Sequence, residues 1–432
     1  MKQQALVRSP IPKRRKALAI AVSTAAALAG SQTARSDLMI EEIVVTATKR
    51  SENLQDVPQA LQAFTTDDIR KQRFLGIDDY VKKVPSLSFA SREPGGLSVV
   101  FRGVAVSGVS YGANPSSSVY LDENPITASG RNANPRLIDI QRVEALSGPQ
   151  GTLFGDASQS GALRIITNKP DTSEASGWID GMLNAFEEGD TGYDLSGMAN
   201  IPLVADKLAL RLVGFSGKEA GYIDNVGGRS PGRTFTNADI ADNDVNSADV
   251  SGARANLRWD INQDWSAEFT SLFEKRSADG FGDVNLDVGD LQQLRYENES
   301  LDDEWYQLAL TLEGPVAGMD GTLAVSYFNR DFRYEVDATD YEFSLESNSA
   351  GYAFYDFGGD PRGHATNREE EDRWSVEARL ATPSDSASRW SGIVGVFYNK
   401  SQSDTLFESF ARDFGDTNFF TYLNYHAYEQ NG

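Results

Sequence analysis

Residues 139–155 read DIQRVEALSGPQGTLFG, the most specific pattern in the chain. Val143–Leu146 is the apolar centre of a short predicted strand, and the glycine-rich turn Gly148–Gly151 follows it. A second turn is expected at Phe154-Gly155. Glycine-rich turns after short strands are typical of a compact domain with small elements. Because the turn lacks the Lys and the Ser or Thr of a P-loop, it does not indicate a nucleotide site.

The segments on either side predict more elements of the same size. Thr65–Asp68 is typical of a helix start, because Thr and Asp side chains cap the first turn. A second helix is expected before Pro85, where apolar residues recur at helical spacing: Ile77, Tyr80, Val81 and Val84. Further short strands are expected at Ser98–Phe101, Ser118–Leu121 and Leu163–Thr167. Residues 51–170 therefore predict a compact α/β domain, with exposed loops at Ser91–Gly96 and Ser107–Ser118.

After Pro170 the pattern changes to longer strands with clean alternation. In residues 253–259, Ala, Leu and Trp occupy one face and Arg and Asn the other. Strands of about ten residues with this pattern fit either an outer-membrane β-barrel or a soluble β-sandwich. The barrel is favoured because very short connections alternate with long acidic ones, at 219–249, 277–302 and 336–369.

Composition excludes several classes of function. The chain has 432 residues, a formal net charge of −23, no Cys and two His. The absence of Cys excludes disulfides and iron–sulfur clusters, and two His leave no room for a multi-histidine metal centre. The acidic balance argues against a nucleic-acid partner, since phosphate binding needs a basic surface. No run of 18 apolar residues is present, so no membrane-spanning helix is expected.

The N-terminus is typical of an exported protein. Residues 1–30 carry six basic residues and no acid, and the apolar run Ala17–Ala29 ends in small residues. This pattern predicts a secretory signal peptide, followed by a leader over residues 31–50. The leader contains a short β-branched run, Ile43–Thr48. Such a run suits either addition to the sheet edge of a partner or an ordinary edge strand.

Together these motifs resemble the TonB-dependent outer-membrane receptors of siderophores and related nutrients. Glu42–Ala47 resembles the TonB box, and Phe101–Gly103 and Val119–Asp122 resemble two signatures of the plug domain. Asp139–Gly155 resembles the most specific plug signature, and Gly161–Pro170 the end of the plug.

Two positions depart from the pattern of the family that the chain resembles. Ser147 stands where that family usually has Arg, which removes a charge that could pair inside the barrel. Asp122-Glu123-Asn124 stands where the family often has Asp-Gly, and this departure is expected to alter a turn.

The resemblance implies that residues 51–170 are a plug domain and residues 171–432 a transmembrane β-barrel. The 262 residues of this second part are too few for about 22 strands of about ten residues with their loops. The expected fold is therefore a partial barrel, about 9–10 of about 22 antiparallel strands, in a truncated chain unable to close it. Plug residues Arg102, Arg142, Glu144 and Arg164 are expected to pair with lumen-facing Glu268, Glu377, Arg254 and Arg373.

The resemblance also implies energy-coupled import across the cell outer membrane, with no enzyme activity, cofactor or metal. TonB would bind the periplasmic segment of Glu42, Ile43, Val44, Val45, Thr46 and Ala47. A ferric siderophore is the expected ligand, and outer-membrane lipid would cover the apolar strand face. Arg92 and Tyr111 are the expected ligand contacts, because a cation suits an anionic chelate and an aromatic ring a planar one.

Two alternatives stay open. The chain could be a truncated, non-transporting receptor fragment that acts only as a binding or interaction protein. It could also be a hydrolase, because Gly108–Gly112 matches the G-x-S-x-G pattern around Ser110. That pattern requires a helix after the serine, and loop-forming residues follow it here. The acidic loop 283–294 lacks the Gly and Glu positions of a calcium-binding loop.

Overall fold

The computed structural model describes residues 43–90, 98–105, 115–128, 131–155, 157–229, 234–341, 344, 359–384, 386, 389–414 and 425–426. The expected signal peptide, residues 1–30, lies outside the described residues. So do most of the leader and four residues singled out from the sequence: Glu42, Arg92, Ser110 and Tyr111.

The predicted plug domain is built around a mixed five-stranded sheet. Its strand order is β3-β8-β9-β6-β7, with β6 and β9 parallel. The strands are β3 Ala60–Thr65, β6 Ser117–Leu121, β7 Asn124–Pro125, β8 Ile140–Ser147 and β9 Gly161–Thr167. Two further strands, β4 Leu87–Ala90 and β5 Ser98–Phe101, pair with each other. The strands expected from apolar runs therefore coincide with β5, β6, β8 and β9.

The two helices predicted in this domain are also present. Helix α2 spans Thr66–Gln72, and Thr65 caps it through reciprocal hydrogen bonds with Asp68. Helix α3 spans Ile77–Val81 and buries its apolar residues in the domain core. A short helix, α4 Gly151–Phe154, follows the glycine-rich turn. No helix among the described residues is long and apolar enough to cross a bilayer.

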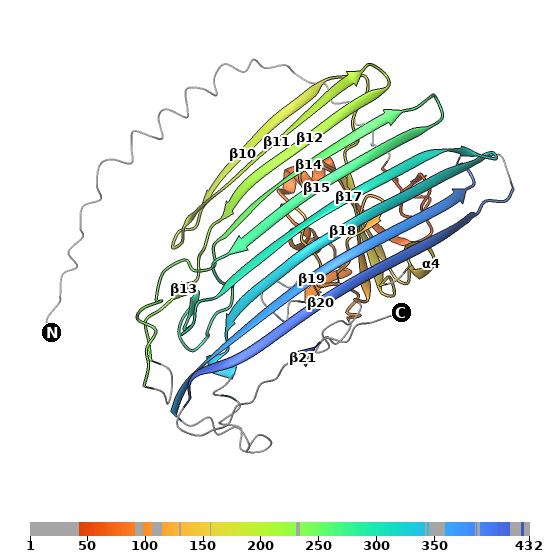
Figure 1. Cartoon of the computed structure of the whole chain (residues 1–432). Helices are drawn as coiled ribbons and strands as arrows, with labels where there is room; N and C mark the ends of the chain where they lie inside the picture. Colours follow the sequence, from red (N-terminus) through yellow and green to blue (C-terminus); the bar gives the residue numbers. More distant parts are fainter. Residues whose placement is uncertain are drawn as a thin grey trace, which may run out of the picture. The chain divides into compact units, whose positions relative to one another are not determined.

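The second part of the chain forms a ten-stranded antiparallel sheet, called the wall below (Figure 1). Its strands follow one another in chain order: β10 Ser176–Ala185, β11 Thr191–Val204, β12 Leu208–Glu219, β14 Ala248–Asp260, β15 Ser266–Ala278, β17 Ser300–Val316, β18 Met319–Asp337, β19 Gly359–Ala381, β20 Ile393–Phe414 and β21 Tyr425–His426. β10 and β21 lie at opposite ends of the sheet. Among the described residues the wall is open, in agreement with the partial barrel expected from the sequence.

Many wall strands are longer than expected. The sequence predicts strands of about ten residues, but β18 has 19 and β19 has 23. Each long strand pairs with an equally extended neighbour, so the backbone hydrogen bonds continue past the length that a bilayer requires. The third long connection is therefore shorter than the predicted 336–369, because β18 continues to Asp337 and β19 begins at Gly359.

The other two long connections contact each other. β13 Asp224–Asn225 lies in the first and β16 Gln292–Gln293 in the second, and the two pair in parallel. These two connections thus form one structured unit on the side of the wall where β12 and β15 end.

The two faces of the wall differ as the alternation predicts. On β10, Ile179 and Leu183 are 85% and 82% exposed, whereas Arg254 and Asn256 on β14 are buried. A soluble sandwich would cover its apolar face with a second sheet, and no described residues do so. The sandwich alternative is therefore wrong, and the exposed apolar face fits contact with lipid.

The buried face of the wall packs on the plug domain. Leu272, Trp305 and Phe328 come from β15, β17 and β18, and they belong to the same apolar cluster as plug residues such as Val99 and Leu163. Between these apolar contacts lie ion pairs that join the two parts, and these pairs surround the candidate site.

Candidate functional site

The predicted TonB-binding segment, Ile43–Ala47, is folded back on the chain. Its strand β1 Val44–Val45 pairs antiparallel with β2 Glu52–Asn53, and Leu54 N donates to Ile43 O at 2.9 Å. Val45 is fully buried, whereas Val44 is 47% exposed. The segment is thus neither a free strand nor an edge of the wall, but a docked hairpin strand held by two residue pairs.

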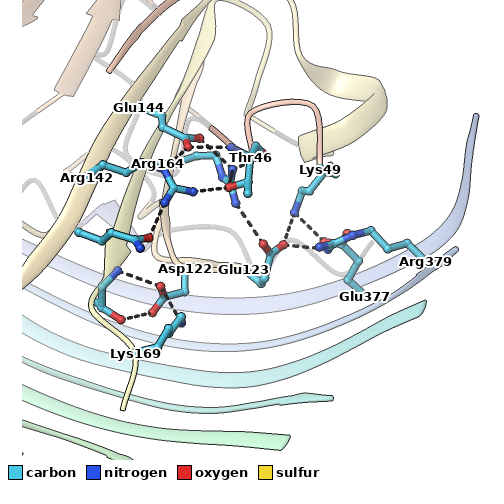
Figure 2. Close-up of polar contacts among 12 residues, drawn as sticks. Thr46, Lys49, Asp122, Glu123, Arg142, Glu144, Arg164, Lys169, Glu377 and Arg379 are labelled. Carbon is cyan, nitrogen blue, oxygen red and sulfur yellow. Dashed lines mark hydrogen bonds and ion pairs between the residues drawn. The ribbon is translucent and has the colours of Figure 1, made fainter. Parts of the chain in front are cut away.

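Thr46 fixes this segment on the plug sheet (Figure 2). Its backbone N–H donates to Glu144 Oε1 at 2.9 Å. Its hydroxyl accepts hydrogen bonds from Arg142 at 3.0 Å and from Arg164 at 2.8 Å. Arg142 and Glu144 are two positions apart on β8, and Arg164 on β9 faces Glu144 in the register. Strand alternation therefore brings the three charged side chains to one face.

Glu144 is ionised at this site. Burial alone would raise its pKa, but Arg164, Arg142 and the Thr46 N–H outweigh burial and hold the pKa of Glu144 below its ordinary value. Glu144 lies 2.7 Å from Arg142 and 2.9 Å from Arg164. These contacts of Thr46 with Arg142, Glu144 and Arg164 are called the first lock below. They connect the segment to two strands of the plug.

A second lock extends from the segment to the wall through Lys49 and Glu123 (Figure 2). Lys49 Nζ lies 3.0 Å from Glu123 of the β6–β7 turn and 3.0 Å from Glu377 of β19. Arg379, also on β19, contacts the same two carboxylates at 2.8 Å each. Burial alone would raise the pKa of Glu123, but Lys49, Arg379 and Arg164 hold it well below its ordinary value.

Other ion pairs join the plug to several wall strands. Asp139 accepts from Arg211 on β12 and Arg254 on β14, at 2.6 and 3.0 Å. Lys169 bridges Asp122 of the plug and Glu268 on β15, at 3.0 and 3.1 Å. Each pair links residues far apart in sequence.

None of the plug–wall pairings expected from the sequence is present among the described residues. Glu268 pairs with Lys169, Glu377 with Lys49 and Arg379, Arg254 with Asp139, and Arg373 with Glu371. Arg142, Glu144 and Arg164 pair among themselves instead of with the wall, and Arg102 is exposed at a left-handed φ of 51°. Alternation identified which residues face the plug, but the partners depend on how the plug is docked.

The two departures from the family pattern have different outcomes. Ser147 donates to the Ser86 hydroxyl at 2.9 Å and joins no ion pair in the described part of the chain. The β6–β7 turn stays tight, with Leu121 opposite Asn124, and Glu123 projects from it into the second lock. Lys49 and Glu123 were missed as site residues because their role depends on contacts 74 positions apart.

The expected ligand contacts lie on loops outside the described residues, so the structure places neither Arg92 nor Tyr111. Among the described residues, no group of three or more His, Asp or Glu side chains could hold a metal ion.

Residues 53–162 match the family model of the TonB-dependent receptor plug domain. This part of the chain is a plug domain of the TonB-dependent receptor kind, as the resemblance predicted. Proteins with this domain are outer-membrane receptors, and the similarity argues against the hydrolase alternative.

Relatives of this receptor chain are known from sequence and structure. The pesticin receptor of Yersinia pestis is 29% identical over 175 residues, which cover 40% of this chain and 25% of the relative. The solved ferric yersiniabactin uptake receptor of Yersinia pestis has a TM-score of 0.63 at 17% identity, covering 82% of this chain and 50% of that one. The pyoverdine outer-membrane receptor of Pseudomonas aeruginosa PAO1 has a TM-score of 0.60 at 14% identity, covering 90% and 54%. The chain thus spans about half the length of these solved receptors.

Proposed function

We propose that this receptor imports a ferric siderophore across the outer membrane, with energy supplied through TonB. The observation that carries the proposal is the docked Ile43–Ala47 segment in front of a plug domain of the TonB-dependent family. The ligand class is supported by the names of the solved relatives, which are receptors of ferric yersiniabactin and pyoverdine. No covalent step is required.

On the periplasmic side, TonB binds the segment by strand addition. β1 is held by only two residue pairs with β2, so a partner strand that offers more backbone hydrogen bonds can replace β2. Exposed Val44 is the first side chain available to such a partner, because Val45 and Ala47 are buried until the segment leaves the plug. Tension on the released segment then acts on the plug.

On the external side, the ligand binds the plug loops Ser91–Gly96 and Ser107–Ser118 and the connections of the wall. Ferric siderophores are often anionic, so Arg92 is proposed to contact the chelate by charge and Tyr111 by its ring.

Uptake of radioactive iron tests the proposal in a deletion strain that carries the gene on a plasmid. Single ferric siderophores are supplied one at a time, and each assay is repeated in cells without TonB and in cells treated with a protonophore. We expect uptake of at least one chelate that is lost in both controls. Lack of TonB-dependent uptake of every chelate would overturn the proposal.

The second candidate function is binding without transport, in which the protein captures a ferric siderophore at the cell surface. The same assay separates the two functions, because a binding-only receptor retains a ferric siderophore at the cell surface but accumulates none inside.

A further inference from the structure

Lys49 connects the predicted TonB-binding segment Ile43–Ala47, called the TonB-facing segment below, to both the plug and the wall. It lies two residues after Ala47, in the turn between β1 and β2, where its backbone N–H donates to Thr46 O at 2.9 Å. Its side chain is 1% exposed, and its ammonium lies 3.0 Å from Glu123 of the plug and 3.0 Å from Glu377 of the wall. One cation of the segment thus bridges two carboxylates that belong to different parts of the molecule.

The surroundings of Lys49 make this bridge strong. Its ammonium lies 5.3 Å from the ring centre of Tyr120 and 4.9 Å from that of Phe154, so the rings shield it from water. A shielded ion pair is stronger than an exposed one, and its loss leaves each buried carboxylate with one cation fewer. Lys49 is therefore held firmly as long as both carboxylates stay in place.

Withdrawal of Lys49 changes the charge balance between plug and wall. Glu123 keeps Arg164 of the plug and Arg379 of the wall. Glu377 keeps, among the described residues, Arg379 of its own strand, and it loses its contact with the segment. Among the described residues, Arg379 is then the cation that contacts both carboxylates, which repel each other across the contact.

We infer that Lys49 is a positioning residue that couples release of the TonB-facing segment to loosening of the plug from β19. The inference rests on the proposed function, because it gives Lys49 a place in the transport cycle. Thr46 attaches the segment to the plug alone, whereas Lys49 also attaches it to the wall. Pulling the segment out therefore removes a plug–wall bridge in the same movement.

Glu123 supplies the plug side of the bridge. It stands in the β6–β7 turn, where its carboxylate lies 3.0 Å from Lys49 and 2.8 Å from Arg379.

Cysteine labelling tests the inference directly, because the chain has no native Cys. A Val45→Cys reporter is buried while the segment is docked, and a maleimide labels it only after release. The assay uses outer-membrane vesicles without ligand or TonB. Adding Lys49→Met to the Val45→Cys variant should raise the labelling rate about tenfold, because Met is similar in side-chain length to Lys but carries no charge. Lys49→Arg should restore slow labelling, and the control Lys71→Met, at an exposed pair with Asp67, should change nothing.

A second reporter separates release from unfolding. Val119→Cys lies in the plug core and should stay unlabelled in the Lys49→Met variant. Equal labelling of Val45→Cys with and without Lys49→Met would overturn the inference, and so would fast labelling at position 119. Neither labelling measurement requires transport. If the parent takes up iron but Val45→Cys is labelled equally with and without Lys49→Met, the inference is rejected and the proposed function stands. Absence of TonB-dependent uptake in the parent rejects the proposed function whatever the labelling shows.

Discussion

Glu144 shows how much of the site depends on one side chain. It is fully buried, and it accepts hydrogen bonds from Arg142, from Arg164 and from the backbone of Thr46. A buried carboxylate is stable only when opposite charges and donors surround it, and here they come from two strands and the docked segment. The same carboxylate therefore organises the plug sheet and holds the segment.

Replacing Glu144 by Gln should destabilise the plug, because two buried guanidinium groups then lose their shared counter-charge. The expected cost is about 3 kcal/mol, equivalent to a fall of about 5–10 °C in melting temperature. Scanning calorimetry of the purified receptor measures the change. The control Glu188→Gln, at an exposed turn between β10 and β11, should melt like the parent. Equal melting of both variants would show that the lock contributes no stability.

The proposed ligand contacts can be tested at the same scale. Arg92→Ala combined with Tyr111→Ala should weaken binding of the ferric siderophore about tenfold or more, because a charge contact and a ring contact are lost together. Equilibrium binding of the labelled chelate to cells measures the affinity. Arg73→Ala serves as the control, since Arg73 is exposed and pairs with Asp180 of the wall. An unchanged affinity in the double variant would remove both residues from the site.

At the scale of elements, the β1–β2 pair combines weak pairing with strong anchoring. Only Val44 and Val45 pair with Glu52 and Asn53, a length that gives little backbone stabilisation. The anchoring comes from the two charged locks at Thr46 and Lys49. This arrangement keeps the segment docked, yet a partner strand can replace its short backbone pairing with β2.

Val45→Pro should abolish energised iron uptake while ligand binding at the cell surface stays intact. Proline removes a backbone donor and prevents strand addition to TonB. Val45→Ala keeps the N–H, so it should retain more uptake than the proline variant. Uptake of labelled iron and surface binding are measured in the same cells. Normal uptake with proline at position 45 would rule out this segment as the TonB-binding strand.

At the scale of the whole molecule, the plug is held to the wall at several separate places. Ion pairs connect it to β12, β14, β15 and β19, and an apolar cluster adds Leu272, Trp305 and Phe328. Charged contacts can exchange partners or take up water, whereas an apolar cluster separates only as a unit. The ion pairs of the plug–wall contact can therefore rearrange one after another.

Acid should loosen this attachment. The folded protein holds the pKa values of Glu123 and Glu144 below the ordinary value of 4.5. Their stabilising contribution is therefore complete above about pH 4.5 and is lost as the pH falls through the lowered values. Melting temperature measured against pH should fall as the pH drops below about 4.5. The Glu123→Gln variant should show a smaller fall, and an equal fall would assign the acid sensitivity to other groups.

The sequence alone determined many of the elements and the orientation of their faces. Thr65 and Asp68 cap α2 through contacts three residues apart, and the alternation in residues 253–259 requires only the geometry of one strand. These interactions are local, so the pattern contains all the information needed. The glycine-rich stretch 139–155 likewise indicated the plug domain.

The tertiary structure alone decided the partners. The sequence gives Arg254 and Glu377 an inward direction, but it cannot say that Asp139 meets the first and Lys49 the second. Pairing depends on how the plug is docked, and several combinations of the same charges satisfy the alternation equally well. Strand length also escaped prediction, since β19 is stabilised by hydrogen bonds to β18 and β20 rather than by its own residues. Local patterns fix directions, and long-range packing selects which charges meet.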